Sequence, residues 1–377
     1  MKINKNHFIA QDDAWKDALH DVASMNLSPL RYGILPPSAA GEETFDVKVS
    51  LDNQNVLRVN VLSLQAVTPG GVRIKLPALT LPGQVASEGL PATTFPFATA
   101  AGENVYWVVL IINPYERLPA GSPDLSENPP RYPSVTPSCE VMVIADSQYK
   151  QYAAHPYALY VGKVTVDGND VRVDEDYLPP CFSVSAHPDL LALHGELDQR
   201  LSNIEARCSQ IVQKIYKKSQ QNEISELVLF LCDRVMLYLG PAITNLRWLT
   251  AHESPARLFA EVVSLARIMK NTIDLRTGTG KDELMNYFTE WCELKQGEFI
   301  SMLTTVSSFR FDNNDLNKDV RRIVAFINII NRLFETLSNL EFIGKRKEAG
   351  IFVKEEHHYE QNTASAEQAK PRRRFFG

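Results

Sequence analysis

The sequence predicts an α+β protein: an N-terminal antiparallel β-sandwich or barrel-like domain, followed by an α-helical bundle with a coiled-coil-like helix. Two periodic patterns of apolar residues predict this fold class. Between residues 45 and 173, apolar residues alternate with polar ones, as in strands that bury one face. After His187-Pro188, apolar residues recur every three or four positions, as on one face of a helix. At 377 residues, the chain is long enough for two domains.

The N-terminal part begins with a helix and continues with strands. Apolar residues between Phe8 and Met25 fall on one helical face. The segment 105–112 lacks alternation, so we expect a strand buried on both faces. Seven prolines between Pro114 and Pro137 predict an irregular surface excursion. The expected strands are residues 45–51, 57–61, 72–76, 105–112, 141–144, 157–166 and 171–173.

The C-terminal part reads as an antiparallel bundle, because its helices are long and their connections are short. The expected helices are residues 190–217, 223–239 with a continuation to 249 past a kink at Gly240-Pro241, 255–269, 282–306 and 316–340. We therefore predict three parts. They are a β-rich domain with the N-terminal helix (1–186), a helical bundle (187–343) and a polar tail (344–377) that cannot bury enough surface to order alone.

The helix at 190–215 carries its apolar positions on two interleaved ladders with seven-residue steps. This is the period of a coiled-coil seam. It predicts either an oligomer of identical chains or one helix of an intrachain bundle, and the two are compatible. His194 and Cys208 would either set the register of an oligomer or be tolerated core residues. The seam residues are Leu190, His194, Leu197, Leu201, Ile204, Cys208, Ile211 and Ile215.

Composition favours a cytosolic protein. The net charge of −6 gives no field that would attract nucleic acid. The five cysteines are scattered and without paired spacing, which fits a reducing compartment and suggests no zinc site. The N-terminus is polar, and no window reaches about 18 uncharged apolar residues, so we expect no direct membrane insertion.

No local motif predicts a catalytic residue, a cofactor or a metal ion. Gly278-Thr279-Gly280-Lys281 is similar to a phosphate-binding loop, but Leu275 replaces its first glycine and Asp282 replaces its Ser or Thr. We interpret it as a helix-to-helix loop. Two histidine pairs, His187 with His194 and His357 with His358, could suggest a metal site. We expect none, because neither pair has a carboxylate or cysteine at ligand spacing. An oligomeric enzyme with a site assembled from distant residues is the alternative from another class.

The end of the chain combines positive charge with two aromatic residues, which favours a short peptide that docks onto another protein. A solvated tail or a cloning remnant would look the same. The residues concerned are Arg372, Arg373, Arg374, Phe375 and Phe376.

Several motifs, in their order along the chain, resemble the TssK family, the trimeric baseplate component of bacterial type VI secretion systems. His7-Phe8-Ile9-Ala10-Gln11-Asp12 with Leu30-Arg31-Tyr32-Gly33 is similar to the family's opening pattern. Val67-Thr68-Pro69-Gly70-Gly71 is similar to a family turn, although glycine replaces the turn aspartate. Residues 107–111 correspond to the family's buried strand, and 252–258 resemble the start of its helical bundle.

The resemblance implies a cytoplasmic homotrimer without catalytic function, peripheral to the inner membrane through partner proteins. Its N-terminal shoulder would bind baseplate wedge proteins similar to TssF and TssG. By this resemblance, we expect the chain to lack the family's C-terminal head, which docks onto the membrane complex. We expect residues 344–377, or another component, to contact a membrane-complex protein instead. A phage-like baseplate or receptor-binding trimer is the alternative.

Overall fold

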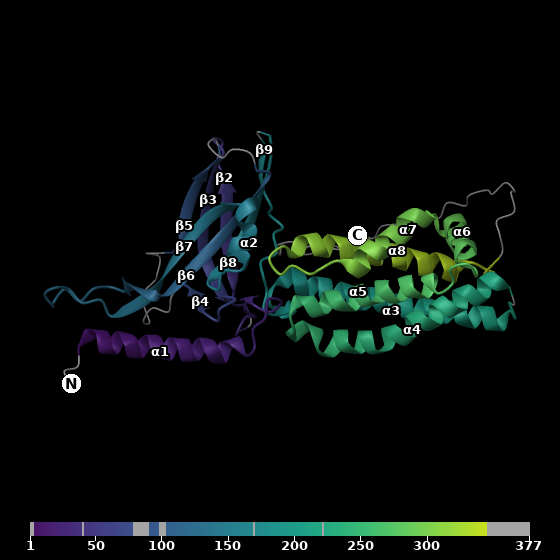
Figure 1. The fold of residues 1–377 in the computed structure, drawn as a ribbon, viewed down its shortest axis with the longest axis horizontal. Coiled ribbons are helices and arrows are strands. Elements are labelled where there is room, and N and C mark those ends of the chain that lie inside the picture. The colour runs from purple at the N-terminus through teal and green to yellow at the C-terminus, as the bar shows by residue number, and fades with distance from the viewer. Residues whose placement is uncertain are drawn as a thin grey trace, which may run out of the picture. The chain divides into compact units, whose positions relative to one another are not determined.

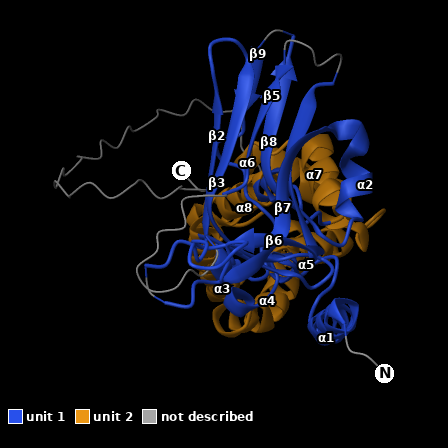
Figure 2. Cartoon of the chain, turned by 90° about the vertical axis from the view of Figure 1, so that its left-hand side faces the viewer, with its two compact units in different colours: residues 1–187, 250–257, 311–320 blue, residues 188–249, 258–310, 321–377 orange. Residues whose placement is uncertain are grey.

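The structure is a computed structural model that describes residues 4–39, 41–77, 90–97, 103–168, 170–220 and 222–344. The chain divides into two compact units, shown in different colours in Figure 2. Unit 1 contains residues 1–187, 250–257 and 311–320. Unit 2 contains residues 188–249, 258–310 and 321–377. Two short segments from the second half of the chain thus belong to the N-terminal unit.

Unit 1 contains two antiparallel sheets (Figure 1). In the first sheet, the long strand β3 pairs with all four other strands. The strands of this sheet are β1 (Gly33–Ile34), β2 (Phe45–Leu51), β3 (Val56–Val67), β4 (Arg73–Leu76) and β5 (Ala92–Pro96). The second sheet has the order β7-β6-β8-β9. Its strands are β6 (Val105–Ala120), β7 (Ser134–Ala145), β8 (Ala158–Asp167) and β9 (Asp170–Val173).

The two sheets face each other closely. A Cβ atom placed on Gly162 of β8 would lie 3.4 Å from a methyl group of Val49 on β2 and 3.3 Å from Val108 on β6. Val108, Val109 and Leu110 have no exposed side-chain surface, as expected for a strand buried on both faces. The predicted fold class, antiparallel sheets followed by helices, is confirmed.

The prolines after Asn113 interrupt the sheet less than the sequence predicts. Strand β6 continues to Ala120, and β7 already begins at Ser134. The expectation of an irregular segment was therefore wrong at both of its ends. Pro114 falls where the β6–β7 ladder skips from Asn113 to Arg117, so its missing N–H removes no ladder bond. Pro137 lies on β7, an edge strand, where proline is tolerated.

Residues 250–257 are tied to the rest of unit 1 by main-chain carbonyls. The Val184 N–H donates to the carbonyl oxygen of Glu253 at 3.0 Å. The hydroxyl of Ser254 donates to the carbonyl oxygen of Leu30. The same hydroxyl accepts from the N–H of Ala256 at 3.3 Å, as expected for a residue that caps the following helix.

Residues 311–320 are held in unit 1 by buried hydrogen bonds to side-chain and main-chain atoms of two asparagines. The Tyr32 hydroxyl donates to Oδ1 of Asn314 at 2.8 Å, and the Tyr177 hydroxyl donates to the carbonyl oxygen of Asn314 at 2.8 Å. Asn317 accepts from the N–H of Leu178 at 3.2 Å. Buried polar groups need such partners, so the segment acts as a clasp on the β-domain. The run of asparagines gives no periodic signal, and the sequence alone did not indicate this role.

The described residues of unit 2 form six helices, of which α5 and α8 begin in unit 1. They are α3 (Pro188–Lys217), α4 (Glu223–Trp248), α5 (Pro255–Asp274), α6 (Lys281–Cys292), α7 (Gln296–Ser308) and α8 (Leu316–Asn339). Two expectations differ from the structure. Helix α4 runs through Pro241 as one element. The single helix expected at 282–306 is two helices, because Glu293 adopts a left-handed conformation with φ 56° and ends α6.

The asparagine clasp predicts a stability effect. Replacing Asn317 with alanine removes its bonds to the N–H of Leu178 and to the carbonyl oxygen of Asp176, at 3.2 and 2.6 Å. Leaving the buried N–H of Leu178 and the partly buried carbonyl of Asp176 without this partner should cost about 2 kcal/mol. Denaturant unfolding would measure the loss. Lys318→Ala, at an exposed neighbouring position, is the control and should unfold as the parent does. Equal free energies of unfolding for the two variants would contradict a stabilising role of Asn317.

Candidate interaction surfaces

The α3 ladder is buried inside the chain's own helical unit. Seven of its eight residues are at most 4% exposed, namely Leu190, Leu197, Leu201, Ile204, Cys208, Ile211 and Ile215. Helix α3 packs along α4, which supplies much of this cover (Figure 1). The ladder therefore leaves no side-chain surface for a second copy. An oligomer of this chain would have to use other residues. The seam packs inside the chain's own helical bundle, which is one of the two alternatives that the sequence predicts.

The two unusual seam residues make contacts inside unit 2. His194 is half-buried, and its Nε2 lies 2.8 Å from the carbonyl oxygen of Leu246 on α4. Burial and a hydrogen bond to Cys232 raise the pKa of the Cys208 thiol far above its usual value. Both residues thus serve the contact between α3 and α4.

Helix α1 (Lys5–Ser24) is a second candidate surface. Its start is fixed by a capping box, in which the Asn4 side chain accepts from the N–H of His7 at 3.3 Å. The ring nitrogen Nδ1 of His7 accepts in return from the N–H of Asn4 at 3.2 Å. None of the helix's residues is fully buried. The sequence predicted this helix correctly, but it did not show which face contacts the protein.

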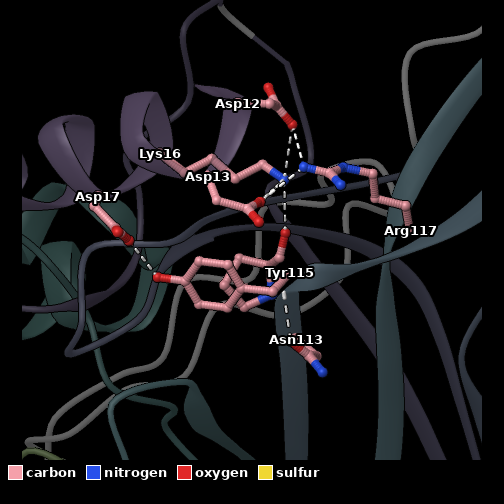
Figure 3. Close-up of polar contacts among 8 residues, drawn as sticks. Asp12, Asp13, Lys16, Asp17, Asn113, Tyr115 and Arg117 are labelled. Atoms are coloured by element: carbon pink, nitrogen blue, oxygen red, sulfur yellow. Dashed lines mark hydrogen bonds and ion pairs between the residues drawn. The ribbon is translucent and has the colours of Figure 1, made fainter. Parts of the chain in front are cut away.

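Polar side chains hold α1 against β6, as Figure 3 shows. Arg117 donates to carboxylate oxygens of both Asp12 and Asp13, the latter at 2.8 Å. Lys16 donates to the carbonyl oxygen of Pro114 at 3.0 Å. The Tyr115 hydroxyl donates to Asp17, and this bond of 2.6 Å completes the set. An apolar helix face is not needed for this attachment.

The attachment perturbs the groups that make it. Hydrogen bonds from Arg117 and Lys16 lower the pKa of Asp12 below its usual value. The bond to the Asp17 carboxylate raises the pKa of the Tyr115 hydroxyl, because ionised tyrosine could no longer donate. The lowered pKa of Asp12 means that its contribution is complete above about pH 4 and is lost as the pH falls further.

A glycine turn lets the C-terminal half of α1 approach the β-domain. Gly71, between β3 and β4, has φ +88°. A Cβ atom there would lie 3.1 Å from the Cβ of Ala23 and 3.3 Å from the carbonyl oxygen of His20. The neighbouring Gly70 donates its N–H to the carbonyl oxygen of Pro156 at 2.7 Å. Glycine at position 71 thus meets both a backbone and a packing requirement.

The large apolar side chains of α1 point into solvent. We call them the outer stripe. They are Phe8, Trp15, Leu19 and Val22 of the helix with Met25 at its C-cap, and each is more than half exposed. The half-buried positions are instead Ile9, Asp13, Lys16, His20 and Ala23. The helix therefore contacts its own chain mostly through polar and small residues and exposes the side that a core helix would bury.

The remaining candidates do not form a further site. The tail residues Arg372, Arg373, Arg374, Phe375 and Phe376 lie outside the described residues. Gly278 and Gly280 lie in the loop between α5 and α6, as expected for a helix-to-helix connection. In the part of the chain that the structure describes, no three His, Cys, Asp or Glu side chains are grouped as metal ligands.

Helix α4 is long and apolar enough to span a membrane, with a mean hydropathy of 1.6 over its most apolar 18-residue window. Buried core helices have the same composition, and α4 buries Leu231, Val235 and Leu239 completely or nearly so. It is the single helix with this property among the described residues.

The structure predicts that an acidic residue in the α3 ladder unfolds the chain. Leu197 is 1% exposed, so Leu197→Asp buries an uncompensated charge and should cost about 4 kcal/mol or more. Thermal melting monitored by circular dichroism would show this loss. Asn203→Asp, at an exposed position of the same helix, should melt as the parent does. A Leu197→Asp variant that stays fully folded but becomes monomeric would favour the oligomer seam.

The polar attachment of α1 predicts a local effect. Arg117→Ala removes the bonds to Asp12 and Asp13, so α1 should detach more often. We expect about fivefold faster amide hydrogen exchange in α1, with unchanged exchange in β3. Arg172→Ala removes an exposed ion pair with Asp170 and should leave α1 exchange unchanged. Equal protection of α1 in all three proteins would show that other contacts hold the helix.

Residues 146–271 match the family model described as "Bacterial Type VI secretion, VC_A0110, EvfL, ImpJ, VasE". The matched residues include β8 and β9 of unit 1 and α3 and α4 of unit 2. No curated protein matches the chain.

The solved structures that are similar to the chain include the following three. TssK from T6SS EAEC in complex with nanobody nb18 is 17% identical, with a TM-score of 0.45 over 87% of this chain and 99% of that chain. A crystal structure of TssK is 14% identical, with a TM-score of 0.48 over 90% of this chain and 68% of that chain. The baseplate complex from the type VI secretion system contains a chain that is 16% identical, with a TM-score of 0.43 over 89% of this chain and 96% of that chain. Residues 146–271 of the chain are therefore similar to a bacterial type VI secretion family, in agreement with the resemblance seen in the sequence motifs.

Proposed function

We propose that this protein is a structural component of a type VI secretion baseplate that acts in the cytoplasm as a multimeric adaptor. The observation that carries the proposal is the match of residues 146–271 to a type VI secretion family. This segment takes in the β8–β9 hairpin together with the α3–α4 pair, so it includes parts of both compact units. The proposed adaptor has no catalytic activity.

The polar groups around a cavity in unit 1 support a structural role better than an enzymatic one. The cavity has a volume of about 560 Å³, and Tyr32 and Asp312 are among the residues that line it. The Asp312 carboxylate accepts from the Tyr149 hydroxyl at 2.6 Å and from the N–H of Asn314 at 3.0 Å. Burial raises the pKa of Tyr32 well above its usual value, and its hydroxyl is bound to Asn314. These groups serve the clasp formed by residues 311–320.

Partners follow from the family resemblance. In the proposed arrangement, unit 1 is the shoulder that binds wedge proteins similar to TssF and TssG. The C-terminal region, including residues 344–377, binds a membrane-complex protein. The protein acts as a homotrimer, so that three weak contacts on one particle gain effective concentration and hold more tightly than one contact. Association with the inner membrane is then indirect, through these partners.

Co-purification from cells that express the other secretion components tests the proposal. The tagged full chain should retain both the wedge proteins and a membrane-complex protein. Deletion of residues 354–377 should abolish capture of the membrane-complex protein, leave wedge capture intact and leave the melting temperature unchanged. A full chain that captures neither component would overturn the proposed function. Persistent capture of the membrane-complex protein by the truncated chain would overturn the role of the tail.

A further inference from the structure

The cavity of unit 1 lies where segments from four parts of the chain meet. It is lined by residues between 24 and 32, by Pro69 in the turn between β3 and β4, by residues 153–154 and by residues 311–314 of the clasp. All of these belong to unit 1. The volume of about 560 Å³ is typical of a pocket that binds a small ligand. We call this space the clasp cavity.

The clasp cavity has a buried end and an exposed end. Tyr32, Asn313 and Asn314 form the buried end and are at most 4% exposed. Leu30, which also lines the cavity, is 44% exposed, and Ala154 lies at the surface as well. The cavity therefore connects solvent with buried polar groups of the clasp.

One of these buried polar groups has an atom without a partner. The amide nitrogen Nδ2 of Asn313 donates to the carbonyl oxygen of Tyr32 at 3.2 Å. This bond fixes which end of the amide is the nitrogen, so the opposite atom, Oδ1, is an acceptor. Oδ1 is buried and accepts no hydrogen bond from any residue that the structure describes. Because a buried acceptor without a partner is unfavourable, we expect a bound group to donate to it.

The charge of the lining favours a cationic donor. Asp312 is the single charged residue among the described residues that line the cavity. One of its carboxylate oxygens accepts from the Tyr149 hydroxyl and the other from the N–H of Asn314, at 2.6 and 3.0 Å. A carboxylate can accept about four hydrogen bonds, so Asp312 retains acceptor capacity. A positive charge near Asn313 would also be attracted by this carboxylate.

We propose that the clasp cavity binds a primary alkylammonium group. The ammonium donates to Oδ1 of Asn313 beside Asp312, and the alkyl chain contacts apolar lining residues such as Leu30 and Phe311. An ammonium fits this site better than a guanidinium, because a guanidinium binds best to two adjacent acceptors and Oδ1 is one. Lysine side chains and free diamines carry the same group.

Saturation-transfer NMR on the full chain, with n-butylammonium as the ligand, tests the site. Saturation of the protein should reach the methylene protons of n-butylammonium. n-Butanol has the same length without the charge and should bind about fivefold more weakly, because it cannot make a charge-assisted hydrogen bond. No transfer to n-butylammonium would show that solvent serves Oδ1, and this result overturns the inference. Equal affinity for the two ligands overturns the ammonium assignment.

Two variants locate the binding in the clasp cavity. Ala154→Trp places a large side chain at the exposed end of the cavity, leaves the bonds of Asn313 unchanged and should abolish binding. Ala10→Trp makes the same change at an exposed position of α1 outside the cavity and should bind as the parent does. Both variants should keep the parent's melting temperature, since both positions are exposed. An Ala154→Trp variant that still binds n-butylammonium as the parent does overturns the location.

A charge variant separates the role of Asp312 from that of the apolar lining. Asp312→Asn keeps the size of the side chain and removes its charge. The affinity for n-butylammonium should fall about fivefold, whereas the affinity for n-butanol should stay the same. A loss of affinity for both ligands, with a melting temperature equal to that of the parent, contradicts the charge selection.

Competition distinguishes the two sources of the ammonium group. The peptide acetyl-Gly-Lys-Gly-amide and 1,4-diaminobutane should each displace n-butylammonium. Tighter binding of the peptide supports a lysine of another polypeptide, and tighter binding of the diamine supports a free amine. Failure of both to displace n-butylammonium overturns the inference. These titrations use the isolated chain, so their outcome is independent of the co-purification that tests the proposed function.

Discussion

The burial of the α3 ladder is the constraint on which the rest of the structure depends. A thirty-residue helix with an unbroken apolar stripe has to cover that stripe, because exposed apolar area is costly in water. Helix α4 supplies much of the cover, and contacts such as the bond between His194 and Leu246 fix the pair. Because the chain covers its own longest apolar stripe, that stripe is not available to another molecule.

Helix α1 has the opposite orientation, with its apolar side turned to solvent. Most amphipathic helices of globular proteins turn their apolar side inward. Here the inward side is held by Arg117 and Lys16, whose charged bonds to acidic residues and to a backbone carbonyl need no apolar contact. The apolar side is consequently free, as its exposed Trp15 and Met25 show. A helix attached in this way can take part in a second contact without leaving its own domain.

The clasp formed by residues 311–320 shows that residues far apart in the sequence can belong to the same compact unit. Asn314 and Asn317 lie in the second half of the sequence but bond to tyrosines and backbone groups of the β-domain. Helices α5 and α8 both begin in such segments and continue in unit 2. A single domain boundary near residue 187 therefore does not separate the two units, because the chain returns to unit 1 at residues 250–257 and 311–320.

The sequence by itself determined the secondary structure and the fold class. Local periods place the strands 45–51 and 105–112 and the helices around 190–217 and 316–340, because the spacing of apolar residues directly reflects backbone geometry. The spacing of apolar residues did not predict where α6 ends. That end depends on one residue, Glu293, which adopts a left-handed conformation. Composition also indicated free cysteines, which the structure shows in all five.

Only the tertiary structure decided what each apolar face contacts. The seven-residue steps of α3 and of α1 look alike in sequence, yet one stripe is buried and the other is exposed. The difference arises from contacts between residues far apart in the chain, such as Arg117 with Asp13 and Asn314 with Tyr32. A period records the geometry of one helix and carries no information about its neighbour. Which stripe remains available to another molecule is therefore a property of the folded chain.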